Sequence, residues 1–227
     1  MIQDPANRYI AALMALYDLS GKDVLELGCG RGRITRDLAR YARFVMATDP
    51  DGTAIEAARA AIPAGNVEFR VEPAGMPALP GGSFDAVIYT LSLHHVPQSG
   101  LAASLAGAAA LLREEGVIIV LEPGDGGSFT AAKERFGAGS GDERQERAAA
   151  VRAMRSLDGW DPGETVIFST RFRFDDENDF LVSMLPGFTA STDQVKGAVM
   201  EFLARHRNGD SIILDAERRL NVLRRKR

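Results

Sequence analysis

Short apolar runs alternate with helix-like segments along residues 23–123, and this alternation constrains the fold more than any other feature of the sequence. Runs of this length, separated by segments with helical spacing, are typical of a parallel sheet covered by helices on both faces. Two further strand-like runs follow later in the chain. We therefore expect an α/β, Rossmann-like, doubly wound and mostly parallel sheet of seven strands. The seven runs are DVLEL, FVMATD, NVEFRV, FDAVIYTL, GVIIVLEP, TVIFSTRFRF and SIILDAERRLNVLRR.

The length of the chain predicts one domain. Its 227 residues, 45% of them hydrophobic, are enough to bury one large core, so we assign residues 1–227 to a single domain. A leading helix lies within residues 1–20, and the ligand-binding core spans residues 21–124. A glycine-rich, charged and partly helical insertion follows the fifth strand at residues 125–163. It is either a lid over the functional edge of the sheet or a solvated connector. Strands and helices occupy residues 164–227.

Charge and composition disfavour several classes of partner. The net charge is −4, which does not favour nucleic acid, and the basic end RRLNVLRRKR reads as a solvated strand end. The single cysteine, Cys29, fits a reducing compartment. No secretory signal opens the sequence and no apolar run is long enough to cross a membrane, so a cytoplasmic protein is expected. No Cys/His cluster has metal-ligand spacing, and we predict no metal.

Three alternate glycines, Gly28, Gly30 and Gly32, end the first apolar run and open a helix. Backbone amides at a helix N-terminus carry the positive end of the dipole, and glycine lets a ligand approach them closely. Asp49 ends the next strand about twenty residues later, where a carboxylate can accept both ribose hydroxyls of a nucleoside. The alternative role for Asp49 is a helix cap. The pattern predicts a nucleoside ligand at the carboxyl ends of the strands.

The spacing of the glycines bears on which nucleoside is bound. The dinucleotide fingerprint Gly-x-Gly-x-x-Gly would place its third glycine at position 33, where this chain has Arg33, and Gly32 comes one residue early. That spacing disfavours a pyrophosphate ligand. An NAD-type oxidoreductase stays the alternative reading.

Four segments resemble the class I S-adenosylmethionine-dependent methyltransferases, in the order and spacing of that family. VLELGCGRG is similar to their first motif, and ATDPDGTAIEAAR to the acidic segment after it. VEPAGMPALPGGSFDAVIYTLSLHHV resembles the methyltransferase type 11 subgroup, which includes the ubiquinone/menaquinone-biosynthesis enzymes, and ALLREEGVIIVLEP resembles the entry to their fifth strand. The likeness covers residues 20–124. It implies S-adenosylmethionine as cofactor, with S-adenosylhomocysteine as product.

The resemblance also implies a role for each matching residue along the cofactor. The methionine end lies against the glycines and near Glu26, which orients the loop or the amino group, and Leu91 faces the carboxypropyl chain. Asp49 holds the ribose. The adenine lies beside Pro50 and is read by Glu72 with the backbone of Pro73 and Ala74. The family often has Asp-Ala at the position of Glu72-Pro73; proline has no N–H, so the adenine contact comes from the next amide or from Glu72. The implied set is Glu26, Gly28, Gly30, Gly32, Asp49, Pro50, Glu72, Pro73, Ala74 and Leu91.

Methyl transfer from a sulfonium is an in-line displacement, in which the protein chiefly positions donor and acceptor. A general base is needed only when the acceptor carries a proton of high pKa. His94, His95, Glu122 and Asp125 follow the fourth and fifth strands, and we favour His94 as the catalytic residue. Within the family that this chain resembles, an enzyme that methylates amino groups of nucleic acid would carry an Asn/Asp-Pro-Pro-Tyr segment after the fourth strand; its absence here favours a small-molecule acceptor. A protein that binds the cofactor without catalysis is a further alternative, and the sequence predicts no oligomeric state.

Overall fold

The computed structural model describes residues 1–72 and 76–226, and the chain forms two compact units. The larger unit contains Ile10–Glu122, Gln145–Val166 and the end of the chain from Arg219. The smaller unit contains Met1–Tyr9, Pro123–Arg144 and Ile167–Arg218. Each unit has its own buried apolar cluster. Whether the chain is one evolutionary and functional domain stays a prediction.

The larger unit is built on a mostly parallel sheet with the strand order β10-β6-β5-β2-β3-β4, where β10 is the strand Ser211–Arg225. The pairs β2–β3, β2–β5, β3–β4 and β5–β6 are all parallel. From β2 the chain adds β3 and β4 on one side, and then β5 and β6 on the other side. The order therefore reverses at β2, and such a reversal marks the binding crevice of open α/β sheets. The parallel strands are β2 (Asp23–Leu27), β3 (Phe44–Asp49), β4 (Val67–Val71), β5 (Phe84–Thr90) and β6 (Leu112–Pro123).

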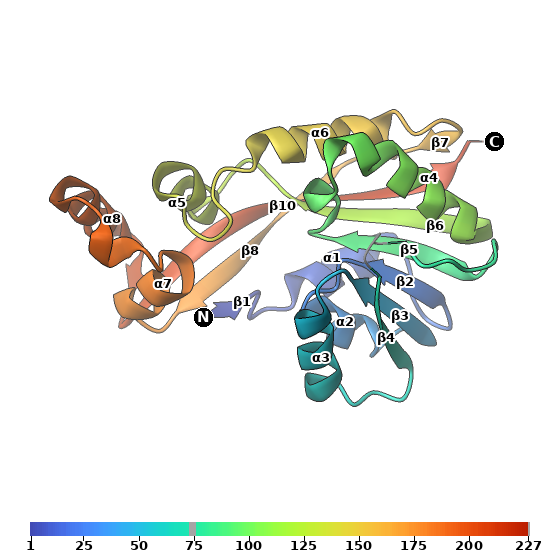
Figure 1. Ribbon diagram of the computed structural model, residues 1–227, viewed down its shortest axis with the longest axis horizontal. Coiled ribbons are helices and arrows are strands. Elements are labelled where there is room, and N and C mark those ends of the chain that lie inside the picture. Colours follow the sequence, from blue (N-terminus) through green and yellow to red (C-terminus); the bar gives the residue numbers. More distant parts are fainter. Residues whose placement is uncertain (73–75, 227) are drawn as a thin grey trace. The chain divides into compact units, whose positions relative to one another are not determined.

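Helices cover both faces of this sheet, as predicted (Figure 1). In Figure 1, α4 and α6 lie on one side of the sheet, and α2 and α3 lie on the other, beside β3 and β4. The helices of this unit are α1 (Arg8–Leu16, whose first turn lies in the smaller unit), α2 (Arg33–Leu38), α3 (Gly52–Ala61), α4 (Leu101–Leu111) and α6 (Arg144–Arg155), with the 3₁₀ turns η1 (Leu93–His95) and η2 (Gln98–Gly100).

Alternation along the strands separates the apolar core from the polar site. Leu25 of β2 and Val87 of β5 pack with Leu105 of α4 and Met154 of α6 in one cluster. Successive strand residues point to opposite faces, so Glu26 points away from this cluster. The strand after α4 begins at Leu112, four residues earlier than expected, because Leu112 pairs with Phe84.

The smaller unit has an antiparallel sheet and an aromatic core. β1 (Ile2–Gln3) and β9 (Arg207–Asn208) pair antiparallel with β8 (Val166–Phe174) and with the start of β10 (Ser211–Arg225), respectively. Phe129 stacks on Phe172 with ring centroids 3.8 Å apart. Its helices are α5 (Ser128–Phe136), α7 (Glu177–Met184) and α8 (Asp193–Arg205), with the 3₁₀ turn η3 (Phe188–Ala190).

The strand predictions hold for every long strand, and the helix predictions hold except at α5. Three two-residue strands, β1, β9 and β7 (Trp160–Asp161), bring the sheet of the described residues to ten strands instead of seven. The segment predicted to be helical only between residues 143 and 157 contains α6 there and also α5, which was not predicted. None of the helices in the described ranges is both long and apolar enough to cross a bilayer.

Candidate active site

The sequence-predicted residues of the larger unit gather where its parallel strands end. Glu26 and the glycines end β2, Asp49 is the last residue of β3, and Leu91 follows β5. Glu122 comes near the end of β6. All of these positions lie at the carboxyl edge of the sheet, around the point where the strand order reverses. Parallel pairing thus brings together residues that are far apart in the sequence.

The amides of the glycine turn are largely used inside the protein. The N–H groups of Gly28 and Cys29 both donate to the Thr48 carbonyl, at 2.8 and 3.0 Å. The Gly30 N–H donates to the Asp49 carboxylate at 2.7 Å, and the Gly32 N–H donates to the Cys29 carbonyl at 3.0 Å. The turn is therefore fixed to the adjacent strand by hydrogen bonds, which differs from the expected row of ligand-facing amides.

The three glycines differ in what a side chain at their position would contact. All have positive φ, at +74°, +53° and +76° for Gly28, Gly30 and Gly32. A Cβ at Gly28 would lie 2.3 Å from the Ser92 Cβ, and one at Gly32 would lie 2.5 Å from Ile62 Cδ1. A Cβ at Gly30 would meet nothing within 4 Å. Gly28 and Gly32 are thus required by packing of the protein, and only Gly30 faces open space.

Asp49 is fixed at the mouth of the turn. Its Oδ2 accepts the Gly30 N–H at 2.7 Å and its Oδ1 accepts the Asp51 N–H at 2.9 Å. Each carboxylate oxygen has a second lone pair, so the group keeps acceptor capacity for a pair of hydroxyls. The alternative role of Asp49 as helix cap is wrong, because Asp51 caps α3 and accepts from Thr53 and Ala54.

Glu26 is fully buried below the turn. Its Oε2 accepts the Thr35 hydroxyl at 2.5 Å and its Oε1 accepts the Thr90 hydroxyl at 2.7 Å. Burial raises the pKa of the Glu26 carboxyl above its ordinary value, because the desolvation of the charge outweighs the two hydroxyl hydrogen bonds. The resemblance gave neither threonine a role: Thr35 follows the first motif, and Thr90 lies in the fourth-strand segment without an implied contact.

Residues 91 and 92 bring the end of β5 close to the turn. Leu91 is a non-glycine residue with φ of +61°, and its N–H donates to the Leu121 carbonyl at 2.7 Å. A side chain in this conformation is strained, and such residues cluster at functional sites. Ser92 donates to the Leu27 carbonyl at 2.5 Å. Ser92 was not predicted, because its contact with Gly28 depends on the pairing of β2 with β5.

The predicted adenine side is described only in part. The Glu72 N–H donates to the Asp49 carbonyl at 3.0 Å, which places Glu72 directly after β4 and near the ribose-binding position. Pro50 is exposed beside Asp49. Pro73 and Ala74 lie outside the described residues, so their predicted contacts stay predictions.

His94 and Glu122 form a buried pair at the ends of β5 and β6. The His94 Nδ1 lies 2.5 Å from Glu122 Oε2, and Glu122 Oε1 accepts the Leu93 N–H at 3.0 Å. Both side chains are buried. A carboxylate at Nδ1 holds the proton there, so Nε2 is the basic nitrogen.

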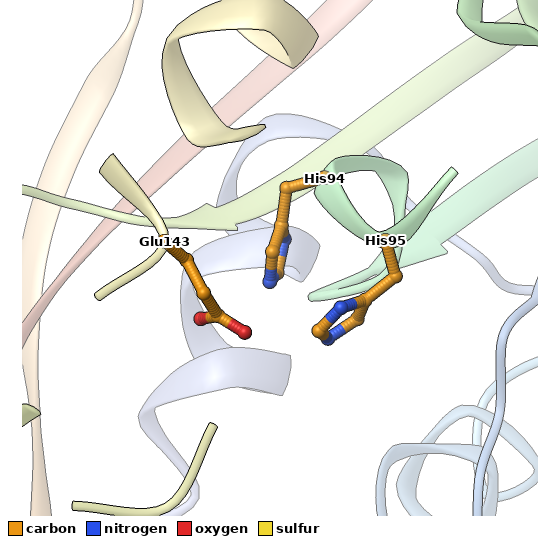
Figure 2. A group of neighbouring side chains, drawn as sticks. All are labelled: His94, His95 and Glu143. Atoms are coloured by element: carbon orange, nitrogen blue, oxygen red, sulfur yellow. The ribbon is translucent and has the colours of Figure 1, made fainter. Parts of the chain in front are cut away.

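The exposed His95 ring lies beside the His94 ring, with centroids 4.0 Å apart (Figure 2). Glu143, also labelled in Figure 2, belongs to the smaller unit, as does Asp125, the fourth candidate base. His94, His95 and Glu122 all belong to the larger unit, and His94 pairs with the buried carboxylate of Glu122.

The mostly parallel sheet with its reversal at β2, and the glycine turn facing an acidic residue on β3, define a Rossmann-like α/β fold. Residues 24–116 match a family model described as a methyltransferase domain. An uncharacterized methyltransferase of Mycobacterium tuberculosis H37Rv is 31% identical over 99 residues, which are 44% of this chain and 50% of the relative. The aligned segment thus spans about half the length of the relative.

Solved structures share the fold over nearly the whole chain. An S-adenosylmethionine-dependent methyltransferase from Mesorhizobium loti has a TM-score of 0.53 and 18% identity, and the match covers 95% of this chain and 99% of that one. The YcgJ protein of Bacillus subtilis has a TM-score of 0.61 and 12% identity, with coverage of 97% and 100%. Phosphoethanolamine N-methyltransferase 1 of Haemonchus contortus, solved with phosphoethanolamine and S-adenosylhomocysteine, has a TM-score of 0.56 and 16% identity, with coverage of 97% and 43%.

These findings support the predicted family. Residues 24–116 are similar to a methyltransferase domain, and a solved S-adenosylmethionine-dependent methyltransferase shares the fold. They favour this interpretation over the NAD-type oxidoreductase, in agreement with Arg33 at the third glycine position.

Proposed function

We propose that the protein binds S-adenosylmethionine at the carboxyl edge of the larger unit's sheet and transfers its methyl group to a small-molecule acceptor. The observation that carries the proposal is the Asp49 carboxylate, which is held at 2.7 Å from the Gly30 N–H at the strand reversal. A small acceptor is supported by the net charge of −4, which does not favour nucleic acid. The cofactor supplies a methyl group already activated on a sulfonium.

The residues present fit this cofactor in charge and shape. Gly30 has φ of +53° and open space where its Cβ would be, so a ligand can lie against the backbone there. Asp49 offers acceptor lone pairs to the ribose hydroxyls. The buried Glu26 lies beneath the turn, where its hydrogen bonds with Thr35 and Thr90 support the backbone that receives the methionine end. Leu91 and Glu72 flank the carboxypropyl and adenine ends.

The acid–base part of the proposal belongs to His94. Glu122 accepts the Nδ1 proton of His94 and also the Leu93 N–H, so one carboxylate fixes both the ring and the turn that carries it. Held in this way, Nε2 takes a proton from an acceptor hydroxyl or amine as the methyl group is transferred. Burial of the pair excludes water from this proton transfer. The further candidates His95, Glu122 and Asp125 then have no direct proton-transfer role.

The test is calorimetric titration of the purified protein with S-adenosylhomocysteine. We expect 1:1 binding by the wild type and at least about tenfold weaker binding by Asp49→Asn, a loss of about 1.4 kcal/mol. Asp51→Asn is the matched control: it removes a carboxylate two residues away, and asparagine keeps the helix cap, so its affinity should be close to that of the wild type. No measurable heat with folded wild-type protein overturns the proposal. Equal effects of the two substitutions overturn the role of Asp49.

A further inference from the structure

A carboxyl group with only neutral hydrogen-bond partners is buried under the glycine turn of the larger unit. The Glu26 side chain is 0% exposed, and its two oxygens accept the hydroxyls of Thr35 and Thr90. Among the residues that the structure describes, no lysine, arginine or histidine forms an ion pair with it. Glutamate is almost never fully buried without a charged partner, so the choice of two hydroxyls calls for a physical reason.

Hydroxyl partners suit a carboxyl group that changes its charge. A threonine hydroxyl can donate to an ionised carboxylate, and it can also accept from a protonated carboxyl. The hydrogen bonds around Glu26 are therefore satisfied in both protonation states without movement of the backbone. A lysine or arginine only donates and would hold the carboxylate in its charged form. The residue types around Glu26 thus fit a group that gains and loses a proton in the folded protein.

The charged and titratable groups around Glu26 come from several elements. Burial raises the pKa of the Glu26 carboxyl above its ordinary value; Arg33, at the start of α2, favours the ionised form, and Asp49, at the end of β3, disfavours it. Cys29 lies in the turn itself, where burial raises the pKa of its thiol, so the thiol stays neutral near neutral pH. From β5 the contact is the neutral Thr90.

The proposed cofactor differs from its product by one positive charge. The sulfonium stands between the ribose and the methionine chain, and S-adenosylhomocysteine has a neutral thioether in its place. Asp49, at the proposed ribose position, already acts on Glu26 through its charge, and Gly30 leaves open space for a ligand beside the turn. In a site with little water, charges act on one another without direct contact. Glu26 should therefore be ionised more readily when a sulfonium lies at the turn.

We propose that Glu26 releases a proton when the cationic cofactor binds, and that this release makes the preference for S-adenosylmethionine over S-adenosylhomocysteine depend on pH. The O–H bond of the carboxyl breaks, its electron pair stays on the oxygen, and the proton leaves to the buffer. The inference rests on the proposed function, since it needs the cofactor at the turn. Thr35 and Thr90 are positioning residues, because they hold the carboxyl in either state.

The direction of the pH effect follows from the charges. At acidic pH the substrate has to displace the proton of Glu26 in order to bind tightly, whereas the product has no sulfonium and gains less from this displacement. A fall in pH therefore weakens the binding of substrate more than the binding of product. The site would then respond to acidification with stronger product inhibition.

Calorimetric titration of the full chain with each ligand, between about pH 5 and pH 7, covers the range into which a raised glutamate pKa falls. From pH 7 to pH 5, the Kd of S-adenosylmethionine should rise at least about fivefold and that of S-adenosylhomocysteine less than about twofold; one proton allows at most about tenfold per pH unit. At pH 6, titrations in phosphate and in imidazole buffer, which differ in ionisation enthalpy, should show net proton release with S-adenosylmethionine.

Glu26→Gln removes the titrating carboxyl and keeps hydrogen-bonding atoms for both threonines. This variant retains Asp49 and the titrating groups of the ligands, so any pH dependence that it loses belongs to Glu26. The ratio of its two Kd values should be constant with pH, and its net proton release should disappear. Equal pH dependence in the wild type and in Glu26→Gln overturns the inference, and so does equal pH dependence of the two ligands in the wild type.

Thr90→Val gives a second test, which does not depend on the folding of Glu26→Gln. It removes a hydrogen bond that favours the ionised carboxylate, so the pH at which S-adenosylmethionine affinity falls should move upward, and Thr90→Ser should return it to the wild-type value. Thr48→Val is the matched control, because the Thr48 hydroxyl donates to the backbone carbonyl of Glu26, at 3.3 Å, and that pH should stay unchanged. An unmoved pH in Thr90→Val overturns the inference.

Failure of the inference is distinguishable from failure of the proposed function. Binding of both ligands with a pH dependence that Glu26→Gln leaves unchanged overturns the role of Glu26 alone. If folded wild-type protein gives no heat with either ligand at any pH, the proposed function is overturned, and the inference with it.

Discussion

At the scale of single residues, the His94–Glu122 pair carries the chemistry that is most open to test. His94→Asn keeps an N–H donor for Glu122 but removes the basic Nε2. We expect turnover of labelled S-adenosylmethionine with a pool of small metabolites to fall by about 10²–10⁴-fold, while affinity for S-adenosylhomocysteine stays within about twofold. His95→Asn is the matched control, because His95 is exposed and adjacent, and its turnover should stay near that of the wild type. Unchanged turnover in His94→Asn would mean that positioning alone is enough for the transfer.

The raised pKa of the Glu26 carboxyl predicts that the free energy of unfolding depends on pH. Burial raises the pKa of its carboxyl above the ordinary 4.5, so the folded state favours the protonated form. The stability that this form contributes is fully present below pH 4.5 and is lost as the pH rises through the raised folded pKa. Relative to Glu26→Gln, the free energy of unfolding of the wild type should therefore fall across this window and level off above it.

Urea unfolding followed by Trp160 fluorescence measures this difference, since Trp160 is the single tryptophan of the chain and is buried in the core of the larger unit. Contributions from other carboxylates cancel when the two proteins are compared at each pH. A difference that is constant with pH would show that the Glu26 carboxyl titrates alike in the folded and unfolded chain.

At the scale of elements, two glycines of the same turn should have different roles: Gly28 is needed for packing of the protein, and Gly30 for contact with the ligand. Gly28→Ala places a Cβ 2.3 Å from the Ser92 Cβ at a positive φ, and we expect it to lower the free energy of unfolding by about 2–5 kcal/mol. Gly30→Ala meets no atom and should cost only about 1–2 kcal/mol. Its affinity for S-adenosylhomocysteine should nevertheless fall by at least about tenfold, or about 1.4 kcal/mol.

Chemical denaturation and calorimetry on the two variants provide these values. Adding Ser92→Gly to Gly28→Ala should restore part of the lost stability, because it removes the atom that clashes. If Gly30→Ala binds as tightly as the wild type, the ligand does not lie against this part of the turn.

The elements themselves follow from local patterns, whereas the contacts among them do not. Apolar periodicity and glycine spacing suffice for β2–β6, for α6 and for the placement of Asp49. They do not reveal that Gly28 is required by Ser92, or that Glu26 meets Thr35 and Thr90, because these contacts depend on the order of strands in the sheet. Asp51, and not Asp49, caps α3 because side-chain oxygens bond amides two or three residues ahead. The amides of the turn, expected to face a ligand, are used largely by Thr48 and Asp49.

At the scale of the whole molecule, the two units have separate apolar cores, and cofactor binding should stabilise them unequally. The predicted cofactor residues all belong to the larger unit. Some amides of the larger unit exchange only when the whole unit unfolds. At a ligand concentration about 100 times the Kd, binding should raise the free energy of opening of these amides by about 2.7 kcal/mol. Amides in the smaller unit's core, such as that of Phe202, should gain much less if the units open separately.

Hydrogen exchange with and without S-adenosylhomocysteine measures both gains in one experiment. Protection that rises by the same amount in α4 and α8 would show a single cooperative unit. Protection that rises only in the smaller unit would contradict the cofactor site itself.

The interleaving of the two units along the chain has a consequence for biosynthesis. The larger unit needs strand residues from Arg219 onward, and the smaller unit combines the first nine residues with segments up to Arg218. A nascent chain therefore completes neither unit before the residues around Arg218 and Arg219 have been synthesised. The strand β6 in particular must wait for its outer neighbour, β10, which follows it by about a hundred residues.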